Sequence, residues 1–250
     1  NNLNIYISYL IPQVSYLLAI IFFSRYAKFD FKLNIKQNAK KHSVKYIIAL
    51  FLGAGLFFSA LLLNYLLQKL YVVLDFDIQI TVPSLNTPID YLFSFILICI
   101  IPPVCEELMF RKTLSDGFST LGAINAALLS GAIFSLSHLN PAQTIYQFIL
   151  GFILALIYIR TKDILITIIV HIVNNLLAFF LTALTNPQIW IQFRVLLLCF
   201  LIALPITVLG LYLILKGGKV NSKKEEKIGT LTIGVLATLG VLWLIIAIFS

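Results

Sequence analysis

Charged residues are scarce in this chain. Of its 250 residues only 11% are Asp, Glu, Lys or Arg, while 60% are hydrophobic, and the mean hydropathy is +1.00. A soluble domain carries about a quarter charged residues, so this composition argues against a soluble protein and indicates that the chain is dissolved in a bilayer. No stretch is left over for a soluble domain, and we expect a single transmembrane domain over residues 1–250.

Other features that are scarce or absent narrow the function. The chain has three cysteines, an odd number, all in or beside apolar segments, so a disulfide framework is not expected. The net charge is +8, but no basic face with interleaved aromatic residues is present, and nucleic-acid binding is not expected. The HExxH signature of many zinc peptidases is also absent.

Apolar runs long enough to cross a membrane are abundant. Runs of about 20 residues predict an all-α, polytopic membrane helix bundle with about eight transmembrane helices. The first run lacks a charged leader and a small-residue cleavage pattern, so we expect it to be a retained span. The predicted spans lie near Ile5–Phe23, Tyr46–Leu67, Tyr91–Pro103, Leu121–Ser137, Ala142–Ile159, Ile164–Leu184, Val195–Leu215 and Ile228–Phe249.

The lysines and arginines predict the orientation. With eight spans, four basic clusters fall on one side of the membrane, and the opposite connections hold little more than Lys69 and Arg194. Cytoplasmic loops carry the excess of Lys and Arg, so we expect the basic loops to be cytoplasmic and both termini to face outward. The clusters lie within Arg25–Lys45, Arg111–Lys112, Arg160–Lys162 and Lys216–Lys227.

A few ionisable side chains lie within or next to the predicted spans. Such groups are costly in a membrane, usually face the bundle interior and often mark function. His42, in contrast, belongs to a basic connection, and we expect no function for it. The candidates are Glu106, Glu107 and Arg111 after the third span, His138 after the fourth, and His171 with Asn174 and Asn175 inside the sixth.

Helical spacing separates the two glutamates. Residues four apart share a helix face, so Glu107 can reach Arg111, while Glu106 points roughly 100° away. A carboxylate held by an arginine is a poor base, whereas one partly desolvated without a cation is a better one. We therefore expect Glu106 to be the base and Glu107 the structural partner.

The third span ends in a double proline. Proline is tolerated in the first turn of a helix but not in its interior, so we expect the span to break at Pro102–Pro103 and restart before Glu106. Broken backbone at membrane depth is tolerated only inside protein or beside water. A hydrated cavity near the glutamates is the expected consequence.

Three short motifs carry a family resemblance. EELMFR at Glu106–Arg111, FSLSH at Phe134–His138 and HIVNN at His171–Asn175 resemble the EExxxR, FxxxH and HxxxN motifs of the CAAX protease and bacteriocin-processing (CPBP/Abi) family of membrane endopeptidases. The eukaryotic members are type II CAAX prenyl endopeptidases. The motif-bearing core covers about residues 90–182, and Lys112 departs from the small residue that many members have after the arginine.

The resemblance implies a role for each matching residue. Glu106 would activate water with help from Glu107 and Arg111, His138 and His171 would position the water or a metal, and Asn175 with a histidine would stabilise the oxyanion. Glu106, His138 and His171 are thus also candidate ligands for one divalent metal such as zinc, although a metal-free glutamate mechanism fits them equally. The expected substrate is a membrane-embedded or lipidated peptide or protein. The Asn-, Ile- and Lys-rich composition is typical of a low-GC bacterium, which predicts a bacterial plasma membrane.

Alternatives remain open at this stage. The chain could be a non-proteolytic membrane immunity or scaffold protein whose polar network fixes helix packing, as in bacteriocin self-immunity. A small transporter is disfavoured because no repeat with paired broken helices is found. A straight span count also puts Glu106 and His171 toward the cytoplasmic half but His138 toward the outer half, unless the fourth helix is short or tilted.

Overall fold

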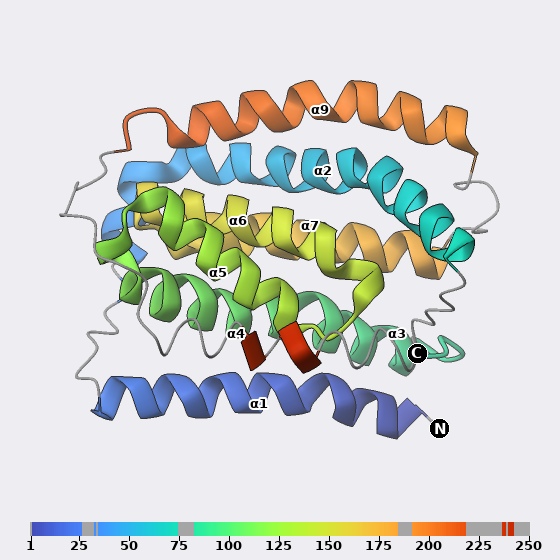
Figure 1. The fold of residues 1–250 in the computed structure, drawn as a ribbon, viewed down its shortest axis with the longest axis horizontal. Helices are drawn as coiled ribbons and strands as arrows, with labels where there is room; N and C mark the ends of the chain where they lie inside the picture. Colours follow the sequence, from blue (N-terminus) through green and yellow to red (C-terminus); the bar gives the residue numbers. More distant parts are fainter. Residues whose placement is uncertain are drawn as a thin grey trace.

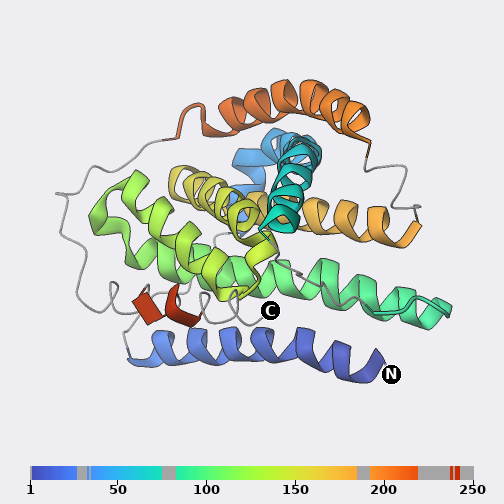
Figure 2. The same ribbon diagram turned by 45° about the vertical axis from the view of Figure 1, so that its right-hand side comes forward.

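The structure is a computed structural model that describes residues 2–26, 33, 35–74, 83–184, 192–218, 237–238 and 240–242. Across these residues the chain forms helices joined by turns, with no strand. The long helices run side by side as one bundle, with α1 on one flank and α9 on the opposite flank in both views (Figures 1 and 2). The predicted all-α membrane bundle is confirmed.

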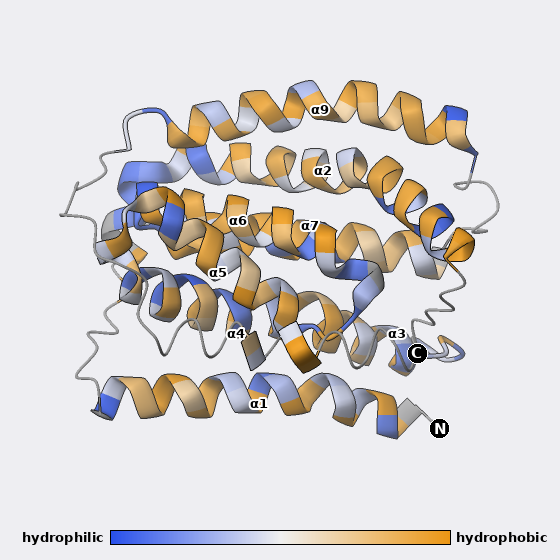
Figure 3. Cartoon of the chain, viewed as in Figure 1, coloured by the Kyte–Doolittle hydropathy of each residue, from blue (hydrophilic) through white to orange (hydrophobic). Residues whose placement is uncertain are grey.

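Six of the described helices are long and apolar enough to cross a membrane. Their outward faces carry large hydrophobic side chains, such as Leu18, Phe51 and Leu201, each about 60% exposed, and the ribbon is hydrophobic along most of its length (Figure 3). The six are α1 (Asn2–Tyr26), α2 (Ile35–Val73), the composite helix Pro88–Ser115, α6 (Thr144–Thr161), α7 (Ile164–Leu184) and α9 (Phe193–Leu215).

The predicted count of eight spans differs from the described helices at the fourth span, while the eighth span is not covered by the described residues. The fourth run forms α5 (Ala123–Ser137), which has 15 residues and is roughly 22 Å long at 1.5 Å per residue, shorter than a bilayer core. The last predicted span, Ile228–Phe249, lies almost entirely outside the described residues. The other six predicted spans coincide with the six helices above.

The predicted break at Pro102–Pro103 is wrong. The chain stays helical from Pro88 to Ser115, because the strain is absorbed by a π-helical segment, η1 (Phe95–Ile100), just before the prolines. The N–H of Ile101 donates to the carbonyl of Ile96, five residues back, and the prolines then fall in the first turn of α4 (Ile101–Glu106). Proline is accommodated there because that turn needs no N–H donor.

A second π-helical segment, η2 (Glu107–Ser115), follows directly. The hydroxyls of Thr113 and Ser115 donate to carbonyls five residues earlier, at 3.1 Å and 2.9 Å. The composite helix of α3 (Pro88–Ser94), η1, α4 and η2 therefore carries Glu106 at the end of α4 and Glu107 at the start of the widened η2. Widened turns of this kind often occur at functional sites.

Close helix contacts depend on glycines. At the crossing of α5 and α6, a Cβ on Gly131 would lie 2.7 Å from the backbone nitrogen of Phe152, and one on Gly151 would lie 2.8 Å from the Phe134 ring. Small residues let membrane helices approach closely. This contact fixes α5, and with it the end of the helix that carries His138.

Replacing Gly131 with alanine is expected to destabilise the bundle. The new methyl group meets backbone rather than a movable side chain, and overpacking of this kind costs about 1–3 kcal/mol. Thermal unfolding in detergent should show a melting temperature several degrees lower, a shift that follows from that free energy. Gly117→Ala is the control, because an added Cβ there has no atom within 4 Å. Equal melting of both variants would contradict the packing argument.

Candidate active site

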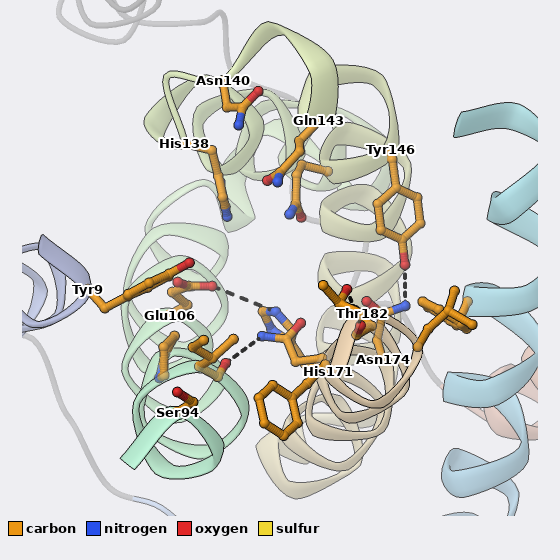
Figure 4. A pocket seen from close by; sticks show the side chains of 18 of the residues that line it. Tyr9, Ser94, Glu106, His138, Asn140, Gln143, Tyr146, His171, Asn174 and Thr182 are labelled. Carbon is orange, nitrogen blue, oxygen red and sulfur yellow. Dashed lines mark hydrogen bonds and ion pairs between the residues drawn. The ribbon is translucent and has the colours of Figure 1, made fainter. Parts of the chain in front are cut away.

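The three motifs meet at one cavity. Glu106 from α4, His138 at the end of α5, and His171 and Asn175 from α7 all line a cavity of about 850 Å³ inside the bundle. Figure 4 shows Glu106, His138 and His171 around the same empty space. The predicted mismatch in depth does not arise, because α5 is short and ends at Ser137.

A histidine lies between the two glutamates. His171 Nδ1 is 2.9 Å from Glu107 Oε1, and its Nε2 is 3.7 Å from Glu106 Oε2. The first distance is a hydrogen bond, whereas the second is too long for one, and a water in the cavity beside the two atoms can contact both. With the Nδ1 proton donated to Glu107, the Nε2 atom is left facing Glu106.

The predicted pairing of Glu107 with Arg111 is confirmed. Arg111 Nε lies 3.0 Å from Glu107 Oε2, and both side chains are fully buried. Glu107 is absent from the cavity lining, while Glu106 is part of it. The two carboxylates therefore differ in surroundings: one is held by a cation and a histidine away from the cavity, and the other faces it.

Phe134 connects the motifs through its ring. The Arg111 Cζ atom lies 4.6 Å from the ring centroid, a cation–π distance. His138 and His171 approach the same ring edge-on, at centroid distances of 4.7 Å and 5.8 Å. The Nη1 and Nη2 atoms of Arg111 have no hydrogen-bond partner among the described residues, so the guanidinium is stabilised mainly by the carboxylates and this ring.

The tautomer of His138 follows from its backbone contact. His138 Nδ1 is 2.8 Å from the carbonyl oxygen of Phe134. A carbonyl only accepts, so Nδ1 carries the proton and Nε2 of the neutral ring is an acceptor. Leu139 follows in the left-handed region, at φ 49°, which is costly for a leucine and ends the helix at this point.

Asn175 and Asn174 make different contacts. Asn175 Nδ2 donates to the carbonyl of Ile98 at 3.1 Å, inside the π-helical segment η1, which leaves its second amide hydrogen uncommitted to that bond. Asn174 Nδ2 donates to the hydroxyl oxygen of Tyr146 on α6. The Tyr146 hydroxyl proton can therefore point into the cavity, which both residues line.

Several lining residues had no role in the sequence prediction. Tyr146, Gln147, Gln13 and Asn64 line the cavity, and each is a polar residue within an apolar span. That signal was present in the sequence, but uncharged polar residues in membrane helices also form ordinary interhelical hydrogen bonds. Their position in the cavity lining is what distinguishes residues of the candidate site from residues with such a structural role.

The described residues do not form a metal site. No group of three His, Cys, Asp or Glu side chains among them is arranged to hold a metal ion. Glu106, His138 and His171 line the same cavity, but as placed here they are not grouped closely enough to act as a three-ligand set.

His42 lies outside this site. It sits at a kink in α2 (φ −119°, ψ 19°), where Nδ1 is 2.9 Å from Asp163 Oδ2. Asp163 also accepts from the hydroxyl of Tyr46 at 2.8 Å and from the N–H of Leu165. This buried cluster joins α2 to the start of α7.

Comparison with known proteins agrees with the motifs. Residues 88–177 match the family described as type II CAAX prenyl endopeptidase Rce1-like, which confirms the resemblance over that segment. A curated Bacillus subtilis (strain 168) protein named "Putative membrane peptidase YdiL" is 31% identical over 77 residues, 30% of this chain and 32% of that protein. The matched segment thus spans about a third of that relative's length. No solved structure gives a significant match.

Proposed function

We propose that this membrane chain, whose residues 88–177 match the Rce1-like family of type II CAAX prenyl endopeptidases, is an intramembrane endopeptidase that hydrolyses peptide bonds with water activated by Glu106. The observation that supports it most is the placement of Glu106, His138 and His171, from three separate helices, around one cavity. Ionisable groups at membrane depth are rare and are usually functional.

Glu106 is the general base in this mechanism. Its carboxylate lines the cavity and lies 3.7 Å from His171 Nε2, and a water in the cavity beside the two atoms can contact both. Glu106 takes a proton from that water as its oxygen attacks the scissile carbonyl carbon. When the C–N bond of the tetrahedral intermediate breaks, Glu106 returns the proton to the leaving nitrogen.

Glu107 and Arg111 act as positioning residues. Arg111 pairs with Glu107 at 3.0 Å, and Glu107 fixes the His171 tautomer and ring orientation at 2.9 Å. His138 Nε2, an acceptor when its Nδ1 bonds Phe134, would orient the attacking water. In this mechanism both histidines position the attacking water, and neither donates a proton to the leaving nitrogen.

The oxyanion requires donors. The uncommitted amide hydrogen of Asn175 and the hydroxyl of Tyr146, which is bonded at its oxygen by Asn174, face the cavity. Preorganised donors of this kind stabilise charge that develops on the carbonyl oxygen. Tyr146 is an addition to the residues expected from the sequence.

A scaffold or immunity protein is the second candidate. The fully buried Glu107–Arg111 pair, bonded to His171 on α7, would also fix the packing of α7 against the composite helix. That role needs no cavity and no hydrolysis. The two proposals therefore make different predictions for the purified protein: an endopeptidase hydrolyses peptides, and a scaffold protein does not.

His138 provides the test. The chain reconstituted in liposomes should cleave blocked, internally quenched hydrophobic peptides, with products identified by mass spectrometry. His138→Gln should lower kcat by about 10²-fold with KM little changed, in the range for a group that orients the reacting water. No cleavage by the unmodified protein over a broad peptide set would favour the scaffold role.

A further inference from the structure

The cavity extends toward one end of the bundle. On α1 its lining runs from Ser8 to Tyr16, on α2 from Phe57 to Gln68, and on α7 from His171 to Ala183. In each helix the lining begins near the middle and continues toward the end remote from the basic residues, which are Arg25 on α1, Lys40 to Lys45 on α2 and Lys162 just before α7.

The composite helix and the α5–α6 connection follow the same pattern. The lining runs from Tyr91 to Glu106, ahead of Arg111 and Lys112, and it includes the turn at Asn140 but not Arg160 at the other end of α6. Pro83 and Leu85, which follow α2 in the chain, line the cavity at the same end, so six chain segments agree. Because basic loops are cytoplasmic, the cavity extends from about the middle of the membrane toward the outer side.

Among the described residues, the lining carries no lysine, arginine or aspartate, and Glu106 is the one carboxylate. A substrate held by a phosphate headgroup or a terminal carboxylate would find no cation among these residues. Carboxamides are abundant instead, and each offers the same donor and acceptor groups as a peptide bond. They are Gln13, Asn64, Gln68, Asn140, Gln143, Gln147, Asn174 and Asn175.

Three of these carboxamides have a buried oxygen without a hydrogen-bond partner among the described residues: Gln13 Oε1, Asn64 Oδ1 and Gln147 Oε1. Gln13 is only 5% exposed. They come from α1, α2 and α6, so they surround the cavity on separate helices. A buried acceptor left unpaired is destabilising, and a bound N–H donor removes that cost.

We propose that the cavity receives an extended peptide segment from the side of the membrane opposite the basic loops, and that Gln13, Asn64 and Gln147 accept hydrogen bonds from its main-chain N–H groups. The substrate is then an uncharged internal stretch of a peptide in the outer half of the bilayer, not a chain end recognised by its carboxylate. The cleavage of that segment rests on the proposed function, whereas its binding and its side of access do not.

Thiol labelling tests the side of access. In a background with the three native cysteines replaced by alanine, Gln68→Cys places a thiol on an exposed, cavity-lining position, and Gly117→Cys places one at the basic end with no atom within 4 Å of the new Cβ. A membrane-impermeant maleimide on intact cells should label Gln68→Cys and should label Gly117→Cys only after permeabilisation. The reverse pattern, or no labelling of Gln68→Cys before permeabilisation, overturns the assigned side whether or not the protein is a peptidase.

Peptide binding tests the carboxamides without requiring catalysis. In a Glu106→Gln background, a fluorescent hydrophobic peptide blocked at both ends should bind, and Gln13→Leu or Gln147→Leu should each raise Kd about fivefold to tenfold, as expected for one lost hydrogen bond. Val14→Leu on the exposed face of α1 is the control. Unchanged Kd in both glutamine variants, or tighter binding of the same peptide with a free C-terminal carboxylate, overturns the proposed recognition.

Discussion

Replacement of Glu106 with glutamine is expected to reduce kcat for peptide hydrolysis by at least about 10³-fold while the protein stays folded. General-base catalysis contributes about 10²–10⁴-fold, and an amide cannot take the proton from water. The structural cost is small because the Glu106 carboxylate is 3.7 Å from His171 and is not hydrogen-bonded to it. Hydrolysis of quenched peptides in liposomes and melting in detergent measure the two quantities.

A matched carboxylate-to-amide change provides the control. Asp116 binds Lys112 and Lys162 at the basic end, at 3.1 Å and 2.6 Å, outside the cavity lining. Asp116→Asn should leave kcat within about twofold, because Asp116 and its partners Lys112, Lys162 and Tyr158 are all outside the cavity lining. If Glu106→Gln retained the activity of the unmodified protein, water activation by this residue would be excluded.

Removal of the Arg111 cation is expected to be the most destabilising single change in the chain. Arg111→Met leaves the carboxylate of Glu107 buried and ionised without its cation, and breaking a buried pair from one side costs about 3–5 kcal/mol. The double variant Glu107→Gln with Arg111→Met should recover most of that stability, because no uncompensated charge remains. Thermal unfolding of the unmodified protein, Glu107→Gln, Arg111→Met and the double variant completes a double-mutant cycle, which measures the coupling between the two residues.

Activity should not recover together with stability. In the double variant His171 loses the carboxylate that fixes its ring at 2.9 Å, so we expect kcat to stay at least about tenfold below that of the unmodified protein, as for lost orienting partners. Lys112→Met is the control, since that lysine pairs with Asp116 at 3.1 Å and is not part of the cavity lining. Full recovery of kcat in the double variant would show that Glu107 and Arg111 do not position the histidine.

The local features of this protein were accessible from sequence. Hydropathy alone located six of the described helices, because a bilayer requires long apolar segments. The contact between Glu107 and Arg111 was also predictable, since residues four apart on a helix meet whatever surrounds them. The three motifs identified the family segment that the comparison later confirmed at residues 88–177.

Other features were decided by neighbours in space. The π-helical turns at η1 absorb the double proline that sequence rules read as a break, and α5 is too short to cross the membrane in full, which brings His138 to the cavity. The bond between His171 and Glu107 joins positions 64 residues apart. The hydrophobic periodicity of a helix does not predict this bond, because the rotation and depth of each helix depend on how it packs against its neighbours.

The sequence by itself determined a membrane protein with a basic side and three polar motifs, because hydropathy, charge and i,i+4 spacing are properties of one segment at a time. Only the tertiary structure decided that the three motifs meet at one cavity, toward which end of the bundle that cavity extends, and that Gln13, Asn64 and Gln147 share it. Those outcomes depend on glycine contacts between helices and on the burial of a charge pair, and both arise only when separate segments pack together.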